Sequence, residues 1–378
     1  MYKVLCLNKI SPVGTKRFGE AYTFSPEMEN PQGILVRSAS MHDMELGENL
    51  LAIARAGAGV NNIPVDDCTE KGLVVFNTPG ANANAVKELV LCALFLTSRK
   101  IAPALDWVKT LKGQGDQVEK LIEKGKGQFA GPEIQGKALG VVGLGAIGIL
   151  VANAASQLGM EVYGYDPYLS VEHAWRLSSA VHLSPSLDEV YQKCDYITLH
   201  LPQTKDTKGM VNGESLQKMK DGVRILNFAR GALVDTDALL EALGQGKVAA
   251  YATDFPADAM LGVEGVVALP HLGASTPESE DNCAMMAARE VKEYLDNGSI
   301  INSVNLPNLT MAWAAKTRVC VISKGADAAA IAGAVPAVAS ASNTRGEYAY
   351  TILDTDAAVD EAAIAAIPGV LRVRVLTR

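Results

Sequence analysis

Cysteine is scarce in this chain and is never grouped. Six cysteines are spread over 378 residues, and no Cys-x-x-Cys pair or nearby histidine gives the spacing of a metal site. We therefore expect reduced cysteines, no bound metal and a cytoplasmic protein rather than a disulfide framework.

Runs of positive charge and long apolar stretches are also missing. Lys and Arg number 34 against 42 Asp and Glu, so the formal net charge is −8, and no basic stripe favours nucleic acid or an anionic membrane. The most apolar stretch, residues 326–341, is interrupted by Asp327 and Pro336, which excludes a membrane span. The N-terminal segment has the pattern of a short strand rather than a signal peptide. We expect a soluble globular protein without a nucleic-acid or membrane partner.

A glycine-rich turn follows an apolar strand in the middle of the chain. Residues 139–148 are Leu-Gly-Val-Val-Gly-Leu-Gly-Ala-Ile-Gly. In such a turn Gly143 permits the tight bend, Gly145 lets the backbone approach a pyrophosphate, and Gly148 lets the following helix pack closely. Asp166 ends the next apolar strand, where a carboxylate binds the ribose hydroxyls of NAD and repels the 2′-phosphate of NADP. The pattern predicts NAD as cofactor.

Apolar strands alternate with helical patterns over most of the chain, which predicts an α/β protein with parallel sheets. Short strands are expected at 33–37, 52–56 and 74–77, and a long helix at 83–99. Six further strands, which fit a doubly wound sheet, are expected at 139–142, 162–165, 196–200, 223–228, 249–253 and 266–269.

The segment between this long helix and the glycine-rich turn, residues 113–131, is polar and predicts an exposed excursion. From Arg318 the order is strand, helix, strand, strand, helix, strand, as in ferredoxin-like domains. Residues 325–345 look too short for both a full helix and a strand.

Ionisable side chains gather just after the predicted strands of the second half. They are Arg230, Asp254, Asp258 and His271, and ligands of open α/β sheets bind at the carboxyl ends of the strands. An arginine can hold a substrate carboxylate, while an imidazole oriented by a carboxylate can transfer a hydroxyl proton. Taken singly, each residue is also compatible with an ordinary structural role.

Taken together, the motifs resemble the D-2-hydroxyacid dehydrogenase family over nearly the whole chain, and most closely its phosphoglycerate-oxidising members. The segments that carry the resemblance are 34–38, 55–62, 76–80, 143–148, 200–202, 227–231 and 270–276. The resemblance implies a doubly wound Rossmann NAD domain inserted in a flavodoxin-like α/β substrate domain, followed by a ferredoxin-like, ACT-like α+β domain. The implied boundaries are 1–94 with 276–305 for the substrate domain, 95–275 for the NAD domain, 306–316 for a linker and 317–378 for the regulatory and oligomerisation domain.

The resemblance also assigns roles to individual residues. The catalytic set would be Arg230, His271 and Asp258, with Asp258 replacing the family's usual glutamate in a segment one residue shorter. The implied cofactor-binding residues are Thr78, Gly143, Gly145, Ala146, Ile147, Gly148, Asp166, His200, Leu201, Pro202, Phe228, Ala229, Arg230, Asp254, His271, Gly273 and Ala274. The implied substrate-binding residues are Arg37, Ser38, Arg55, Gly57, Ala58, Gly59, Arg230 and His271, with Arg37 and Arg55 on the substrate phosphate.

The implied reaction is the NAD-dependent oxidation of 3-phosphoglycerate to 3-phosphohydroxypyruvate, the first step of phosphorylated L-serine biosynthesis. A glyoxylate or hydroxypyruvate reductase would keep the same catalytic residues, and an NAD-sensing regulator on the same scaffold is a third hypothesis. The resemblance further implies a homo-oligomer, dimer or tetramer, with contacts through the tail. Because no Gly-x-Asn turn is present in the tail, we expect weak or no inhibition by serine. We also expect a chain ending near Asn305 to keep its catalytic kcat/KM, because all site residues precede it, but to form smaller oligomers.

Overall fold

A computed structural model describes residues 1–378, which divide into two compact units. Unit 1 consists of residues 1–82 and 277–378, and unit 2 of residues 83–276. This division differs from the boundary expected near residue 94, because helix α3 (Ala83–Arg99) is continuous. Its buried side chains Val86, Val90 and Leu94 belong to the core of unit 2.

Unit 1 contains a five-stranded parallel sheet in the order β2-β1-β3-β4-β5, the order typical of flavodoxin-like folds. Its elements are β1 (Tyr2–Leu7), α1 (Pro12–Thr15), β2 (Tyr22–Ser25), β3 (Gly33–Val36), β4 (Ala52–Arg55), α2 (Val65–Glu70), β5 (Val74–Phe76) and the long α11 (Pro277–Asn297). Strand β2 was not predicted, since its four residues form a short edge strand with a single fully buried residue.

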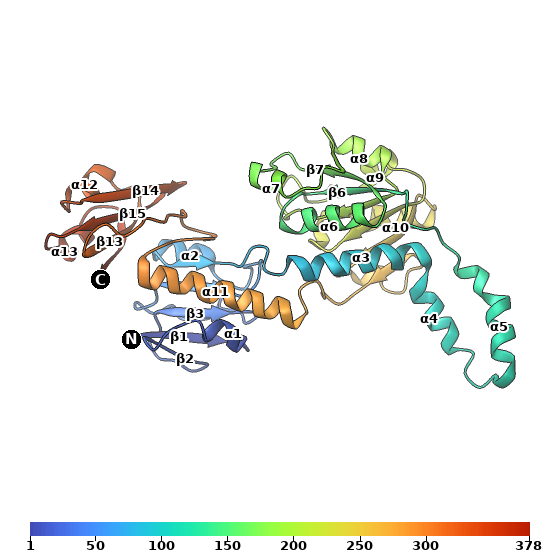
Figure 1. Cartoon of the computed structure of the whole chain (residues 1–378), viewed down its shortest axis with the longest axis horizontal. Coiled ribbons are helices and arrows are strands. Elements are labelled where there is room, and N and C mark those ends of the chain that lie inside the picture. Colours follow the sequence, from blue (N-terminus) through green and yellow to red (C-terminus); the bar gives the residue numbers. More distant parts are fainter. The chain divides into compact units, whose positions relative to one another are not determined.

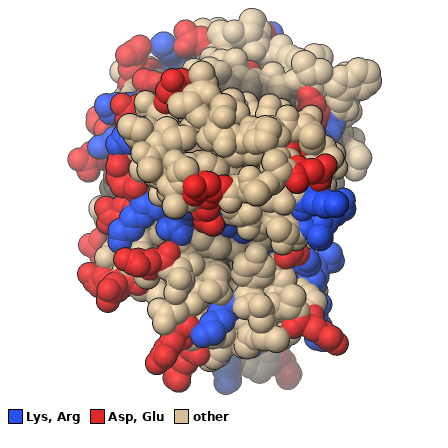
Figure 2. Space-filling model, turned by 90° about the vertical axis from the view of Figure 1, so that its left-hand side faces the viewer, with Lys and Arg blue, Asp and Glu red and all other residues tan.

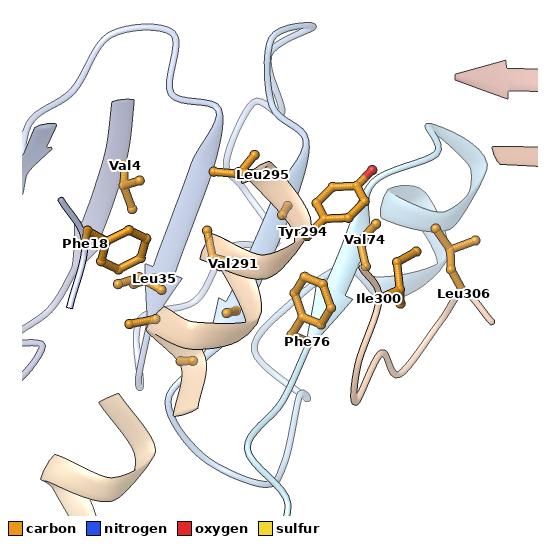
Figure 3. Close-up of a cluster of buried hydrophobic side chains, with 14 of the residues drawn as sticks. Val4, Phe18, Leu35, Val74, Phe76, Val291, Tyr294, Leu295, Ile300 and Leu306 are labelled. Atoms are coloured by element: carbon orange, nitrogen blue, oxygen red, sulfur yellow. The ribbon is translucent and has the colours of Figure 1, made fainter. Parts of the chain in front are cut away.

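Helix α11 supplies much of the core of unit 1. Val291, Tyr294 and Leu295 are fully buried and lie against side chains of the parallel sheet. Figure 3 shows Tyr294 of α11 beside Phe76 of β5, and their ring centroids are 6.1 Å apart. Burying large side chains of this kind stabilises a domain by roughly 1.5–3 kcal/mol each.

Unit 2 is built on a seven-stranded parallel sheet in the order β12-β11-β10-β9-β6-β7-β8. The strands are β6 (Ala138–Val142), β7 (Glu161–Tyr165), β8 (Val181–Leu183), β9 (Tyr196–Leu199), β10 (Val223–Asn227), β11 (Val248–Thr253) and β12 (Val266–Ala268). The doubly wound sheet is as predicted, with β8 as an additional strand at the edge. Three residues with one buried side chain are too few to give β8 a recognisable pattern.

Helices cover the sheet of unit 2 (Figure 1). They are α6 (Ala146–Gln157), α7 (Val171–Trp175), α8 (Leu187–Lys193), α9 (Gly213–Lys218), α10 (Thr236–Gly244) and the short 3-10 turns η3 (Gly231–Leu233) and η4 (Asp258–Met260). An exposed helical arm follows α3, formed by α4 (Ile101–Lys109), η1 (Gly115–Gln117), α5 (Val118–Gly125) and η2 (Lys126–Phe129). The segment 113–131 is therefore exposed as expected, but it is largely helical.

The tail forms a four-stranded antiparallel sheet in the order β14-β15-β13-β16. Its elements are β13 (Thr317–Lys324), α12 (Ala328–Gly333), β14 (Ala339–Arg345), β15 (Tyr348–Thr355), α13 (Glu361–Ala365) and β16 (Val370–Thr377). The ferredoxin-like order is thus confirmed. The doubt about residues 325–345 was wrong, because a helix of six residues and a strand of seven fit into this segment.

One face of the tail sheet belongs to the core of unit 1. Cys320 and Ile322 of β13 and Tyr350 and Ile352 of β15 are buried in the same cluster as Tyr294 of α11. The opposite face packs against α12 and α13 through a separate small core. The expected linker also contributes, since Leu306 is fully buried in the shared cluster.

Polar side chains of the tail bind the C-terminal end of α11. Arg374 donates hydrogen bonds of 3.0 Å to the carbonyl oxygens of Tyr294 and Leu295. Arg318 donates to the carbonyl of Asn297 at 2.9 Å, and the Tyr350 hydroxyl donates to the carbonyl of Gly298 at 2.5 Å. Carbonyls in the last turn of a helix have no partner within the helix. The tail therefore caps α11 together with Tyr2, whose hydroxyl donates to the carbonyl of Leu295 at 2.9 Å, and removing the tail would expose the shared core.

Charged side chains of both signs are interspersed on the face shown in Figure 2, with no continuous basic stripe. None of the helices combines the length and apolar character needed to cross a lipid bilayer.

A buried ion pair gives a test of the tail's contribution to stability. Arg318 and Asp354 are both fully buried, with Nε 2.7 Å from Oδ1. We expect Asp354→Asn to destabilise the protein by about 3–5 kcal/mol, because it leaves the buried guanidinium without a counter-charge. Urea denaturation measures the change. Glu347→Gln, which disrupts an exposed pair of the same tail, is the control and should cost less than about 1 kcal/mol. Equal effects of the two substitutions would contradict the prediction.

Glu290 of α11 predicts a dependence of stability on pH. Burial raises its pKa to about 8, and of its two carboxylate oxygens only Oε1 has a partner, the Nδ2 of Asn302 at 2.7 Å. Because the folded-state pKa lies above the unfolded value, stability is full below the unfolded pKa and falls as pH rises through about 8.

We therefore expect the free energy of unfolding to fall between pH 5 and pH 9, and Glu290→Gln to remove about 2 kcal/mol of that fall. Urea denaturation across this range measures it. Glu278→Gln, on an exposed position of the same helix, is the control. An unchanged slope in the Glu290→Gln protein would show that Glu290 does not titrate in this range.

Candidate active site

The glycine-rich turn lies where the strand order of unit 2 reverses, between β6 and β9. Gly143 has φ 95°, and a Cβ there would lie 2.5 Å from the carbonyl oxygen of His200. A Cβ on Gly148 would overlap the carbonyl of Gly143, whereas one on Gly145 would meet no atom within 4 Å. The turn thus has no space for a side chain at Gly143 or Gly148, and it has free space at Gly145.

Helix α6 begins at this open position. Gly145 is its N-cap, and no side chain caps the first backbone N–H groups. Such a helix N-terminus attracts phosphate through its N–H groups and the helix dipole. The geometry fits the pyrophosphate of a dinucleotide, with Ala146 and Ile147 in the first turn of α6.

Asp166 follows β7 and is held beside the glycine-rich turn. Its Oδ2 accepts a hydrogen bond from the backbone N–H of Leu144 and its Oδ1 from that of Tyr168, both at 2.9 Å. These two contacts fix the carboxylate at the carboxyl end of β7, where the ribose hydroxyls of a dinucleotide are bound in this fold.

His200 follows β9 and precedes Leu201 and Pro202. Its Nε2 lies 3.0 Å from the hydroxyl of Thr198, and burial lowers its pKa to about 3. His200 is therefore neutral at physiological pH. Its carbonyl oxygen lies beside Gly143 of the glycine-rich turn, where a Cβ on that glycine would approach it to 2.5 Å.

The turn that carries Arg230 is organised by the buried side chain of Asn227. Asn227 Oδ1 accepts from the N–H groups of Ala229 and Arg230 at 3.2 and 3.3 Å, and its Nδ2 donates to the carbonyl of Arg230 at 2.9 Å. Phe228 is buried beneath the turn, while Arg230 is exposed. The sequence therefore places a guanidinium on a rigid turn at the end of β10.

Asp254 and the segment around His271 lie together. The backbone N–H of His271 donates to the carbonyl of Asp254, and the N–H of Gly273, which precedes Ala274, donates to Asp254 Oδ2, both at 3.0 Å. Asp254 Oδ1 is buried without a partner. Burial raises the pKa of this carboxyl, and the Gly273 hydrogen bond and the positive charges of His271 and Arg230 partly offset the rise.

His271 itself has an unusual backbone, with φ 44°. Its ring lies 4.5 Å from that of Phe255, centroid to centroid, and the residue is exposed. Left-handed conformations of non-glycine residues persist where the surrounding structure fixes them and are frequent at functional sites. The structure thus brings His271 and Asp254 together through the backbone of the His271 segment.

Asp258 is placed differently from Asp254. It begins η4 and is exposed, and its carboxylate makes no hydrogen bond or ion pair with His271. The motif selected Asp258 as the partner of His271, whereas the hydrogen bonds that the structure shows to the backbone of the His271 segment come from Asp254. Sequence spacing could not decide between the two, because both follow the same strand.

The candidate phosphate-binding residues lie in unit 1. Arg37 follows β3 and Arg55 ends β4, so both stand at the carboxyl ends of neighbouring parallel strands. Arg55 Nε donates to the carbonyl of Arg37 at 3.1 Å. A side chain at Gly57 would overlap the Arg55 guanidinium, so this glycine makes room for the cation at the start of the Gly57–Gly59 loop.

The neighbouring candidates of unit 1 are held by local hydrogen bonds. The N–H of Ser38 donates to Asn8 Oδ1 at 3.1 Å, and the carbonyl of Ala58 accepts from Asn77 Nδ2 at 2.6 Å. Thr78, a cofactor-binding candidate outside unit 2, is buried, and its N–H donates to the carbonyl of Gly57 at 3.1 Å.

One charged residue of this region was not predicted. Glu280, in the first turn of α11, has Oε1 2.7 Å from Nη1 of Arg37. The sequence contains only a weak signal for it, an acidic residue near a helix start, because its partner lies far away in the chain. Three or more His, Cys, Asp or Glu side chains grouped to hold a metal ion occur nowhere in residues 1–378.

The doubly wound sheet, the open glycine turn and Asp166 together define a dinucleotide-binding domain of the dehydrogenase class. Residues 91–273 match the family described as "D-isomer specific 2-hydroxyacid dehydrogenase, NAD binding domain". Residues 91–273 are therefore similar to the NAD-binding domain of this family, as the motifs predicted, and NAD is confirmed as the cofactor.

Relatives extend the similarity beyond this domain. D-3-phosphoglycerate dehydrogenase of Archaeoglobus fulgidus is 36% identical over 296 residues, 75% of this chain and 53% of the relative. The human protein of the same name is 34% identical over 327 residues, 83% of this chain and 59% of the relative. The chain thus spans little more than half the length of these relatives.

Among solved structures, the NAD+-bound 3-phosphoglycerate dehydrogenase of Entamoeba histolytica is similar, with a TM-score of 0.63 and 26% identity. The match covers 82% of this chain and 99% of that one. A glyoxylate reductase of Paecilomyes thermophila has a TM-score of 0.66 at 24% identity and coverage of 80% and 98%, which shows a shared fold.

The position of Asp166 predicts the choice of cofactor. We expect NAD to be preferred over NADP by at least about tenfold in kcat/KM, because the carboxylate repels a 2′-phosphate. Asp166→Ser should reduce this preference by removing the charge. Initial rates with both cofactors measure it, with Asp188→Ser, on the exposed start of α8, as the control. Equal use of the two cofactors by the unmodified protein would refute the assignment.

Proposed function

We propose that this chain is an NAD-dependent D-3-phosphoglycerate dehydrogenase that oxidises 3-phosphoglycerate to 3-phosphohydroxypyruvate, the first step of phosphorylated L-serine biosynthesis. The observation that carries the proposal is the pair Arg37 and Arg55 at adjacent strand ends of unit 1. A second basic and acidic set, Arg230, Asp254 and His271, accompanies the NAD-binding domain. The names of the relatives at 34–36% identity support the same substrate.

The proposed roles follow from the chemistry of a 2-hydroxy acid. NAD, when bound, accepts the hydride from C2 of the substrate. Arg230 binds the substrate carboxylate by charge-assisted hydrogen bonds and polarises the C2 oxygen. His271 accepts the hydroxyl proton as C2 becomes a carbonyl, so that the oxidation yields the keto acid, NADH and one proton.

The imidazolium formed on His271 needs a nearby negative charge. The motif assigns this role to Asp258, and the contacts of Asp254 with the His271 segment favour Asp254. Replacing the responsible aspartate by asparagine should lower the apparent pKa of the basic group in the kcat/KM profile, because an anionic neighbour favours the imidazolium. Comparing Asp254→Asn with Asp258→Asn, together with NAD affinity, separates the two assignments.

We further propose a cytoplasmic homo-oligomer. Six free cysteines suit a reducing compartment. The tail contributes edge strands β14 and β16, each paired on one side only, and an apolar groove of about 470 Å³ lies along α3 and α4, lined by Phe95, Arg99, Ile101, Ala104, Leu105 and Val108. Both features support self-association.

The substrate assignment is tested with 3-phosphoglycerate, D-glycerate and D-lactate assayed in parallel for NADH formation. We expect 3-phosphoglycerate to be preferred, and Arg37→Ala to raise its KM by at least about tenfold while leaving the KM for D-glycerate nearly unchanged. Arg289→Ala, an exposed arginine of α11, is the matched control. Parallel losses on both substrates would assign Arg37 a structural role. If the protein reduces glyoxylate or hydroxypyruvate in preference to oxidising 3-phosphoglycerate, the reductase hypothesis is favoured. If it turns over none of these substrates, the hypothesis of an NAD-sensing regulator is favoured.

A further inference from the structure

The ion pair between Arg37 and Glu280 lies beside the proposed phosphate-binding position. Nη1 of Arg37 is 2.7 Å from Oε1 of Glu280, and the two side chains are 36% and 42% exposed. No other side chain or carbonyl accepts a hydrogen bond from the Arg37 guanidinium, which has five N–H donors. The ion pair therefore engages Nη1 of Arg37 and leaves the other N–H donors of the guanidinium available.

Hydrogen bonds hold the chain at or next to each residue of this ion pair. The carbonyl of Arg37 accepts from Arg55 Nε at 3.1 Å and from Asn62 Nδ2 at 3.5 Å. Next to Glu280, Asp281 Oδ1 accepts a 2.5 Å hydrogen bond from the hydroxyl of Ser11. These contacts hold the chain at Arg37 and next to Glu280.

Close packing holds the first half of α11 as well. A Cβ on Gly14 of α1 would lie 2.5 Å from the carbonyl oxygen of Ala284, so the two helices touch through their backbones. Cys283, in the same turns of α11, is close enough to Arg37 and Arg55 for both cations to lower the pKa of a thiol that burial raises. Glu280 is thus part of one cluster with both arginines.

An exposed ion pair of this kind adds little to stability, about 0–1 kcal/mol. Its effect on binding can be larger, because a long side chain that is already ordered loses less entropy when it takes a ligand. A guanidinium held at one corner also keeps its planar fork in one orientation, which suits bidentate contact with phosphate oxygens.

We propose that Glu280 is a positioning residue that holds the Arg37 guanidinium ready for the phosphate of the substrate. The proposal rests on the proposed function, in which Arg37 binds that phosphate. Glu280 acts through Arg37 and touches no reacting atom, so it governs the affinity for phosphorylated substrates and leaves the chemical step alone.

The test compares Glu280→Ala and Glu280→Gln with the unmodified full-length chain. We expect Glu280→Ala to raise the KM for 3-phosphoglycerate by about 3- to 10-fold, the range expected from ordering one long side chain. The kcat should stay within about twofold, since no interaction specific to the transition state is lost. Glu280→Gln should restore part of the affinity, because its amide oxygen still accepts from Arg37. The KM for D-glycerate should change in neither variant.

Glu278→Ala is the matched control, because it removes the same charge from the same helical turn and has no partner arginine. Protection against thermal unfolding by inorganic phosphate gives a second readout that needs no turnover. We expect phosphate to raise the Tm of the unmodified protein and of Glu278→Ala, and to raise that of Glu280→Ala less.

Each outcome decides the proposal. An unchanged KM for 3-phosphoglycerate in Glu280→Ala would overturn the proposal. A lowered KM would also overturn it, because it would show that Glu280 competes with the phosphate for Arg37. Equal losses on D-glycerate would overturn it in favour of a structural role. If the unmodified protein does not prefer 3-phosphoglycerate, the proposed function fails, and weaker phosphate protection in Glu280→Ala would still support the positioning of Arg37 by Glu280.

Discussion

The C-terminal end of α11 is the point on which unit 1 depends. The helix is buried against the parallel sheet through residues such as Val291 and Leu295, and the carbonyls of its last turn need partners from outside the helix. Arg318 and Arg374 of the tail supply those partners, and apolar side chains of β13 and β15 close the same core. Sheet, helix and tail are therefore one cooperative structure, since removing any of the three would expose apolar surface and buried polar groups together.

The same helix connects this core to the candidate site. Its first turn carries Glu280 against Arg37, and its last turn lies under the tail. The two ends of α11 thus contact a candidate site residue and the tail, respectively.

The two units divide the chemistry between them. Unit 2 carries the dinucleotide turn, and its charged groups Arg230, Asp254 and His271 follow strands whose carboxyl ends lie at one edge of the sheet. In unit 1, Arg37 and Arg55 also lie at the carboxyl ends of neighbouring parallel strands. Parallel sheets leave backbone N–H groups and loop side chains at these edges, where the candidate residues of both units are found.

The sequence by itself determined the parts of this protein whose causes are local. The fingerprint from Gly143 to Gly148 predicted the cofactor, because its glycines shape one short turn before a helix, with close packing at Gly143 and Gly148 and free space at Gly145. Periodicity predicted most strands and the tail's order, and it missed β2 and β8, which are too short to show a period. Tertiary structure alone decided that the tail is part of unit 1, that Glu280 pairs with Arg37, and that Asp254 rather than Asp258 lies against the His271 segment. These features join residues that are distant in the chain or equivalent in spacing, and only packing in three dimensions distinguishes them.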